Sequence, residues 1–222
     1  MAQHSSGAPI AIQRVTPQQA GRLELACEAI GADGAIADLY SAYHDNVSPP
    51  LAWTGLPDAE TFALILEGPD APTERPFLHW MVWNIPGTLQ ALPAGLPGDP
   101  ALKAFGSLIQ GRNSLGQFGY MGPKPPPGDG PHRYHLQLFA LDLTLDLKPS
   151  ASLDELVEVL QANTIASAEL VGTYAESDGV QPVAEPSQRS FATGDAGRGG
   201  LDEDDADRHA PHDDEGVVRP GA

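Results

Sequence analysis

The 222-residue sequence predicts a single, mostly β domain whose helices are set apart from its strands. Short runs of apolar, aromatic or alternating residues recur along most of the chain, and clusters of proline and glycine separate them. A clear helical periodicity appears only after residue 150. Because strand-like and helix-like segments do not alternate, the pattern argues against a βαβ repeat.

Strands are predicted wherever β-branched and aromatic residues gather between turn signals. The four expected strands lie at residues 23–30, 61–67, 78–85 and 133–141. A further short strand is expected near Trp53, directly after the rigid turn at residues 48–50. The other turn signals lie at residues 55–57, 68–72, 86–87 and 97–98.

Helix is predicted only towards the end of the domain. Ser152 and Glu155 have the spacing of a capping box, and Leu153, Leu156, Val157 and Leu160 follow at helical spacing. Residues 164–174 are predicted to form a second short helix. One or two peripheral C-terminal helices are therefore expected beside the strands.

Composition divides the chain into three parts. Residues 1–20 are expected to be a flexible N-terminus, residues 21–178 the folded domain, and residues 179–222 a disordered acidic tail. From about Pro182 onward leucine, isoleucine, valine and phenylalanine become sparse, while glycine and aspartate become frequent. Such a segment cannot bury enough apolar surface to offset the entropy lost on ordering.

Charge and cysteine content exclude several classes of function. A net charge of -18 argues against nucleic-acid binding, which depends on basic groups, and no stretch is long and apolar enough for integral membrane contact. The single cysteine, Cys27, cannot form an intrachain disulfide and is expected to be a buried, inert thiol. No leader-like segment is evident, so the expected location is cytoplasmic, and no cofactor is predicted.

The most informative segment is a proline- and glycine-rich loop at residues 119–131 that runs into the strand beginning near His132. Five prolines and four glycines between Gly119 and Tyr134 require a shaped loop. Side chains alternate across a strand, so His132 and Tyr134 share the face of Leu136. An imidazole and a phenol beside glycine amides suggest a small pocket for a polar or anionic ligand.

Four motifs together resemble the phosphatidylethanolamine-binding protein family, also called Raf kinase inhibitor-like proteins, in its bacterial branch. They are the Ser-Pro-Pro-Leu-x-Trp turn ending at Trp53, the Pro-Asp-Ala-Pro turn around Asp70, the His-Trp-x-Val-x-Asn-Ile-Pro strand from His79, and Gly-Pro-x-Pro-Pro-x-Gly-x-Gly-Pro-His-Arg-Tyr ending at Tyr134. The resemblance covers roughly residues 23–174. It implies an antiparallel β-sandwich-like fold with a small anion pocket at the surface.

The resemblance also implies which side chains line that pocket. By position they are Asp70, His79, His132 and Tyr134, while Gly68 stands where the family carries a first aspartate. Glu67 is adjacent but should point to the opposite strand face. The expected ligand-binding set is completed by four loop residues: Gly119, Tyr120, Gly122 and Pro123. Backbone amides around these glycines are expected to complete a cradle for the anion.

Each of these residues also has a purely structural interpretation. His79 is also consistent with a strand histidine bonded to a backbone carbonyl, although the matching motifs favour the pocket. Asp70 is consistent with a turn cap, a role compatible with the pocket. Arg133 should face away from His132 and act as a structural ion-pair partner. No catalytic nucleophile or metal-ligand spacing is evident, so neither a catalytic residue nor a metal is assigned.

The leading hypothesis is a non-enzymatic binding protein that holds a phosphate or a phosphorylated headgroup. The resemblance suggests that such a protein modulates a kinase or protease, but the sequence identifies no target. Two alternatives remain, a hydrolase using the same pocket and an interaction module acting through the tail. A homodimer also remains open.

Overall fold

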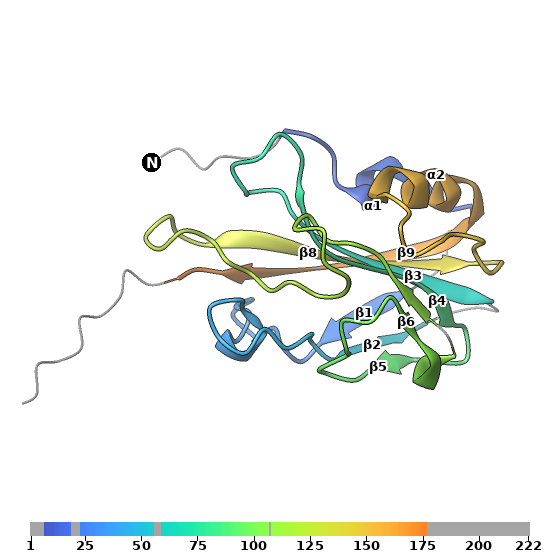
Figure 1. Ribbon diagram of the computed structural model, residues 1–222, viewed down its shortest axis with the longest axis horizontal. Coiled ribbons are helices and arrows are strands. Elements are labelled where there is room, and N and C mark those ends of the chain that lie inside the picture. Colours follow the sequence, from blue (N-terminus) through green and yellow to red (C-terminus); the bar gives the residue numbers. More distant parts are fainter. Residues whose placement is uncertain (1–6, 19–22, 56–58, 107, 177–222) are drawn as a thin grey trace, which may run out of the picture. The chain divides into compact units, whose positions relative to one another are not determined.

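The computed structural model describes residues 7–18, 23–55, 59–106 and 108–176. In this part of the chain, two antiparallel sheets and a helical layer are stacked on one another (Figure 1). The predicted mostly β fold is confirmed. The predicted acidic tail at 179–222 lies outside the described residues.

The larger sheet has six strands and occupies the middle layer (Figure 1). In spatial order its strands are β6 (Ala101–Leu102), β7 (Leu108–Gln110), β4 (Phe77–Pro86), β3 (Thr61–Gly68), β8 (His132–Leu141) and β9 (Thr164–Tyr174). The smaller sheet contains β1 (Glu24–Cys27), β2 (Leu51–Thr54) and β5 (Ala91–Leu92). Two short 3-10 helices lie in the connections, at Asp38–Tyr40 and Lys103–Phe105.

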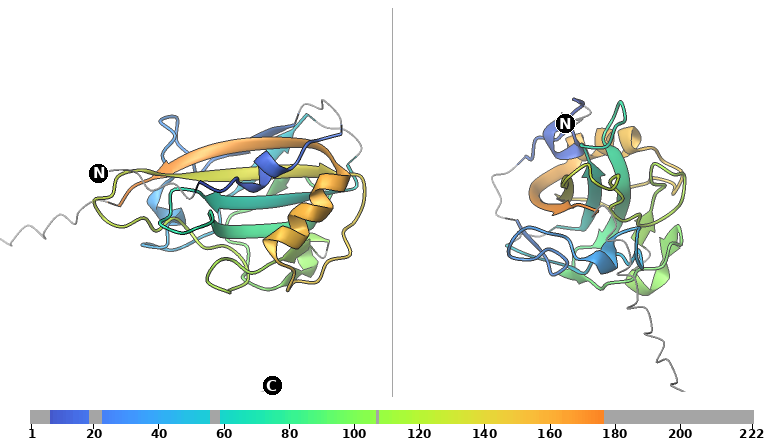
Figure 2. Two further views of the ribbon diagram at one scale, coloured as in Figure 1. Left: turned by 90° about the horizontal axis from the view of Figure 1, so that it is seen from above. Right: turned by 90° about the vertical axis from the view of Figure 1, so that its left-hand side faces the viewer.

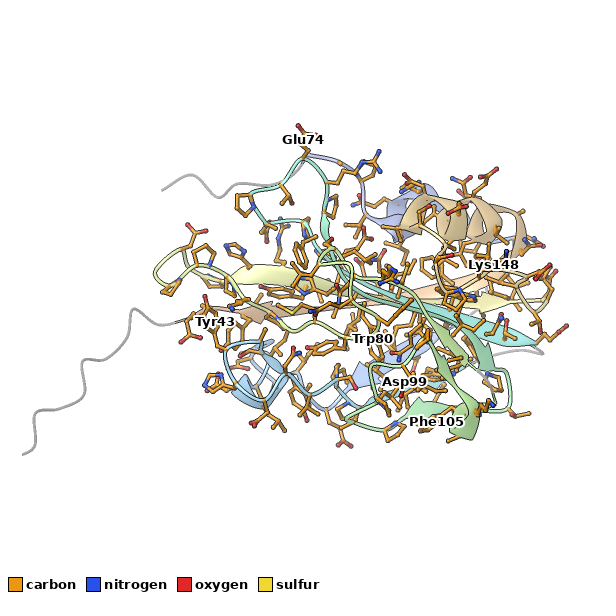
Figure 3. All side chains as sticks on the ribbon, in the orientation of Figure 1. Tyr43, Glu74, Trp80, Asp99, Phe105 and Lys148 are labelled. Atoms are coloured by element: carbon orange, nitrogen blue, oxygen red, sulfur yellow. The ribbon has the colours of Figure 1, made fainter. Side chains whose placement is uncertain are left out.

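The larger sheet is covered on both faces, which explains why its central strands are almost continuously apolar. All eight residues of β3 are buried. Alternate residues contribute to two separate cores: Leu64 and Leu66 pack between the sheets, and Ala63 and Ile65 pack under the helices. Figure 3 shows Trp80 of β4 in the interior between the sheets, where its side chain is fully buried.

The helical layer consists of α1 (Ala11–Arg14) and α2 (Leu153–Asn163), which lie side by side on one face of the larger sheet (Figure 2). The predicted capping box of α2 is confirmed, because Ser152 Oγ accepts from the Glu155 amide and the Glu155 carboxylate accepts from the Ser152 amide. Leu156 and Leu160 pack beneath the helix.

The second predicted helix, at residues 164–174, is wrong. This segment is β9, which pairs with β8 from Leu141↔Thr164 to His132↔Tyr174. Ala166, Ala168 and Tyr174 face the core between the sheets at a period of two. Alanine and glutamate in this segment favour a helix, although the apolar residues also recur at a period of two. Pairing with the long neighbouring strand β8 makes the segment a strand.

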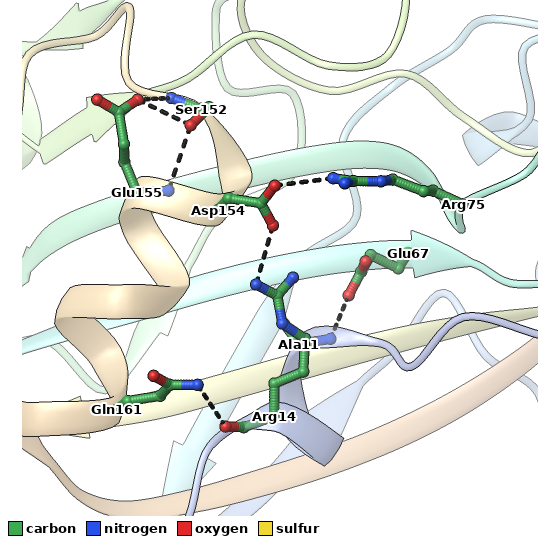
Figure 4. A network of polar contacts seen from close by, with 8 residues as sticks. All are labelled: Ala11, Arg14, Glu67, Arg75, Ser152, Asp154, Glu155 and Gln161. Atoms are coloured by element: carbon green, nitrogen blue, oxygen red, sulfur yellow. Dashed lines mark hydrogen bonds and ion pairs between the residues drawn. The ribbon is translucent and has the colours of Figure 1, made fainter.

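The prediction of a flexible N-terminus at residues 1–20 is wrong for α1, which is attached to the larger sheet. The Ala11 amide donates to Glu67 Oε2 over 2.7 Å, and the Ile12 amide donates to Gln137 Oε1 over 2.5 Å. Figure 4 shows the bond between Ala11 and Glu67 and the neighbouring ion pair between Arg14 and Asp154. The start of the domain therefore includes α1, ten residues before the predicted boundary at residue 21.

Glu67 provides a test of this attachment. Its carboxylate is buried, and burial raises its pKa above the ordinary value. A raised folded-state pKa stabilises the native protein at low pH, and this contribution is lost as pH rises above about 4.3, the unfolded value. Glu67→Gln retains an acceptor oxygen for Ala11 and Gln137 but does not titrate.

The stability of wild type relative to Glu67→Gln should therefore fall between pH 4 and pH 7, with the variant within about 1 kcal/mol of wild type at pH 7. Urea denaturation at the two pH values measures both quantities. Glu28→Gln, at an exposed position, serves as the control. A difference that moves in favour of wild type as pH rises would contradict the conclusion that burial raises the pKa of Glu67.

None of the described helices is long and apolar enough to cross a membrane.

Candidate functional site

The residues singled out in the sequence meet at one end of the larger sheet. Because β3 is antiparallel to both β4 and β8, its last residues lie beside the first residues of those two strands. Gly68 pairs with Phe77, and Glu67 pairs with His135. The turn after β3 and the proline-rich loop before β8 close this end.

A cavity of about 450 Å³ lies at this end of the sheet, within the size range of small-molecule sites. Its walls are mainly apolar: Ala71, Pro72, Phe77, Leu115, Met121, Pro125 and Pro126. The polar side chains at its surface are Thr73, His79, Lys124, His132, Arg133 and Tyr134. Gly68 and Gly122 complete the lining. None of the described residues that line the cavity is an aspartate or glutamate.

His79 lies in the buried floor of the cavity. Its Nδ1 is 2.7 Å from the carbonyl oxygen of Met121, and since a carbonyl only accepts, Nδ1 is the donor. Burial lowers the pKa of His79 to about 4, against smaller opposing effects of the Met121 and Gly122 backbone. The imidazole is therefore neutral at physiological pH. The structural interpretation, a bond to a backbone carbonyl, holds for Nδ1, while the ring also faces the cavity.

Tyr134 stands beside His79 with its ring edge-on, the two ring centres 5.1 Å apart. Burial raises the pKa of the Tyr134 hydroxyl well above its ordinary value, so this group stays protonated and can donate a hydrogen bond. His132 lies two residues earlier on the same strand face and is also buried. The shared face predicted for His132 and Tyr134 is observed.

His132 is oriented by a carboxylate that sequence reasoning missed. Its Nε2 lies 2.9 Å from Asp129 Oδ2, and Asp129 belongs to the proline- and glycine-rich loop. The short sequence separation of the two residues was the available signal, because an aspartate three residues before a strand histidine can reach back to it. Asp129 itself does not line the cavity.

Asp70 is held by Arg133 instead of facing the cavity. Its two carboxylate oxygens accept from Arg133 Nε at 2.9 Å, Nη2 at 2.6 Å and the backbone amide at 2.8 Å. The hydrogen bonds from the Arg133 side chain are the largest cause of the lowered pKa of Asp70. Asp70 is therefore absent from the cavity lining, while Arg133 is part of it. The expectation that Arg133 acts as a structural ion-pair partner agrees with this geometry.

The loop residues expected to form an amide cradle are arranged differently. The Gly119 amide donates to the Gly111 carbonyl, the Met121 amide to the His79 carbonyl, and the Gly122 amide to Asn46 Oδ1. These donors are used inside the protein, so no amide cradle forms there.

Two of the other expected loop residues face elsewhere. Tyr120 and Pro123 line a separate small void beside Cys27, and the Tyr120 hydroxyl donates to the Tyr40 carbonyl. Of the expected binding residues, the structure brings His79, Gly122, His132 and Tyr134 together around the cavity. It places Asp70, Gly119, Tyr120 and Pro123 outside the lining.

Gly68 leaves open space above His79. A Cβ atom at this position would lie 3.1 Å from His79 Nε2 and 3.5 Å from a ring carbon of Tyr134. The residue that precedes it, Glu67, faces the other side of the sheet and is bonded to Ala11 and Gln137, as the alternation predicts. No carboxylate therefore replaces the missing first aspartate next to His79.

Lys124 is the second cavity residue that sequence reasoning missed. It is exposed at the cavity, and its ammonium lies 5.6 Å from the centre of the Tyr43 ring. Its position among four prolines was visible in the sequence, but only the fold of the loop shows that this lysine reaches the cavity. Together with Arg133 it brings positive charge to a protein that is otherwise strongly acidic.

Comparisons with known proteins place this chain in a family. The sequence model described as phosphatidylethanolamine-binding protein matches residues 17–175. A UPF0098 protein of Methanothermobacter thermautotrophicus is 39% identical over 153 residues, covering 68% of this chain and 98% of the relative. YbcL of Escherichia coli is 40% identical over 131 residues, covering 58% of this chain and 72% of YbcL.

Solved structures agree. The crystal structure of Escherichia coli YbcL, described as a member of the mammalian PEBP family, matches with a TM-score of 0.64 and 31% identity, covering 69% of this chain and 98% of that one. A putative phosphatidylethanolamine-binding protein homologue from Chlamydia trachomatis matches with a TM-score of 0.62 and 30% identity, covering 71% and 100%. The resemblance carried by the four motifs is thus confirmed, and this chain belongs to the phosphatidylethanolamine-binding protein family.

Proposed function

We propose that this protein binds a small anionic, phosphate-like ligand in the cavity at the end of the larger sheet. One observation supports this most directly. In a chain of net charge -18, the described lining of the cavity carries Lys124 and Arg133 but no carboxylate. Such a local excess of positive charge attracts anions even when the whole protein is acidic.

The chemistry of the lining supports the same ligand class. Lys124 supplies a point charge, and the protonated Tyr134 hydroxyl supplies a neutral donor. Asp70 neutralises part of the Arg133 charge and holds the guanidinium through Nε and Nη2, so Nη1 is outside this pair. The apolar walls suit a non-polar portion of the same ligand.

Removing the Lys124 charge tests the proposal. Lys124→Ala should weaken binding of inorganic phosphate or phosphoethanolamine about ten-fold, because one charge-assisted contact is lost. Lys148→Ala is the matched control, since Lys148 is also exposed and lies at the far end of the domain from Tyr43, which contacts Lys124 (Figure 3). Isothermal titration calorimetry of the full chain measures the dissociation constant of each ligand for wild type and for the two variants.

Further experiments distinguish a lipid headgroup from a free ligand, and a binding protein from a hydrolase. Co-sedimentation with phosphatidylethanolamine vesicles distinguishes a membrane headgroup from free phosphoethanolamine. The proposal describes a binding protein, so a panel of esters and phosphoesters should remain unhydrolysed. Failure of wild type to bind any of these anions would rule out the proposed function, and equal losses in Lys124→Ala and Lys148→Ala would rule out this cavity as the site.

The resemblance also suggests modulation of a kinase or protease. No residue of the cavity indicates which protein such a target would be. The proposal therefore concerns the small ligand.

A further inference from the structure

We propose that the cavity selects anions that carry their own hydrogen-bond donor, such as hydrogen phosphate or the monoanion of a phosphomonoester, over fully deprotonated anions such as sulfate. The selecting group is His79, which presents an acceptor nitrogen to the ligand. This inference rests on the proposed function, because it names the class of anion that the same cavity takes.

The first step concerns which ring nitrogen of His79 holds the proton. Nδ1 lies 2.7 Å from the Met121 carbonyl oxygen, and this oxygen has no proton to give. The neutral ring must therefore carry its proton on Nδ1. Its Nε2 then has a lone pair and accepts a hydrogen bond.

The second step concerns the charge of the ring. His79 is only 6% exposed, and the charged side chains that line the same cavity, Lys124 and Arg133, are positive. A second proton on the ring would place a charge where burial removes most of its solvation. The nearest carboxylate of the adjoining turn, that of Asp70, is already paired with Arg133. Burial lowers the pKa of His79 to about 4, in agreement with a neutral ring at pH 7.

The third step concerns the space in front of Nε2. Gly68 is the neighbour on this side, at a distance where a Cβ atom would lie 3.1 Å from Nε2. A carboxylate at position 68 would accept a hydrogen bond from a protonated Nε2 and favour the charged ring. Glycine has no such group, so Nε2 remains an acceptor and the space above it stays available to a ligand.

A hydrogen-bond acceptor in the floor of an anion site favours anions that carry a proton over anions that carry none. Inorganic phosphate carries at least one hydroxyl throughout the neutral pH range. A phosphomonoester carries one only in its monoanionic form, which is populated at and below about pH 6. This hydroxyl can donate a hydrogen bond to Nε2. Sulfate has a similar size and tetrahedral shape but no proton at this pH, so one of its oxygens would face the Nε2 lone pair. A buried polar group that a ligand leaves unpaired strongly disfavours that ligand.

Competition between the two anions tests the inference. Titration calorimetry of the full chain at pH 6.5 and constant ionic strength should show inorganic phosphate binding at least about ten-fold more tightly than sulfate. Phosphoethanolamine in a parallel titration distinguishes free phosphate from a headgroup monoester. His79→Ala removes the acceptor and should bring the ratio of the phosphate and sulfate dissociation constants close to one.

A second measurement uses wild-type protein alone, so it does not require that His79→Ala folds. Long-range proton–nitrogen correlation NMR of wild type should show His79 protonated at Nδ1 alone, with its Nε2 resonance shifted by phosphate but not by sulfate. Equal phosphate and sulfate affinities, both weakened by Lys124→Ala, would overturn this inference while leaving the anion site in place. No binding of either anion would remove the proposed function, and the inference with it.

Discussion

Replacing Gly122 by alanine should destabilise the fold by about 3 kcal/mol, at the upper end of the range for overpacking a closely packed position. A Cβ atom at Gly122 would lie 2.2 Å from the Tyr40 carbonyl oxygen and 2.8 Å from the Ala42 amide nitrogen. Both obstacles are backbone atoms and cannot rotate away. The Gly122 amide is also fixed to Asn46 Oδ1 at 2.7 Å, so the loop can move only by breaking this bond.

The same substitution should weaken ligand binding, because Gly122 and its neighbour Met121 line the cavity and Met121 holds His79. Denaturant unfolding followed by tryptophan fluorescence measures the loss of stability. Gly130→Ala is the control in the same loop, where a Cβ atom meets nothing within 4 Å and only the positive φ of 86° is unfavourable. That strain costs about 1 kcal/mol. Equal losses in the two variants would contradict a steric role for Gly122.

Asp70→Ala should lower the free energy of unfolding by about 2 kcal/mol at pH 7. This value lies between those for exposed ion pairs and for fully buried ion pairs. The carboxylate of Asp70 is buried and accepts three hydrogen bonds from Arg133, whereas the Arg133 side chain is about half exposed and regains water when its partner is removed. The lost bond to the Arg133 amide lies at the start of β8. The turn that forms one wall of the cavity should therefore loosen as well.

The pH dependence of this loss has a definite sign. The pKa of Asp70 is lowered in the folded state, so its contribution is present above the unfolded value of about 3.9 and is lost as pH falls further. Urea unfolding should therefore show a larger difference between wild type and Asp70→Ala at pH 7 than near pH 2.5. Asp142→Ala, at an exposed aspartate, is the control. A difference that persists unchanged in acid would show that the ion pair is not its source.

Local pattern was enough to predict the central strands and the common face of His132 and Tyr134, because alternation depends only on neighbours in the chain. It failed for β9, where the decisive influence is a ten-residue pairing with β8. It also failed for Asp70. That aspartate lies 63 residues from Arg133 in sequence, and nothing in the local turn reveals that the two side chains meet.

The amides of the proline-rich loop show a further limit of sequence reasoning. A glycine near a predicted pocket suggests an amide available to a ligand, but Gly122 is small because Tyr40 passes close to it. Composition shows that a loop must be shaped, whereas only the fold shows which of its backbone groups are already bonded. The cavity residues were therefore predicted in part, and their roles less well.

The two neighbouring residues at the end of β3 have a practical consequence for anyone shortening this protein. Glu67 faces the N-terminal helix and Gly68 faces the cavity, so α1 and the floor of the cavity share one stretch of backbone. A fragment cut at the family boundary near residue 17 would lack α1 and leave the acceptors of Glu67 and Gln137 without their amide donors. Fragments made for ligand screening should keep residues 7–18, even though none of them touches the cavity.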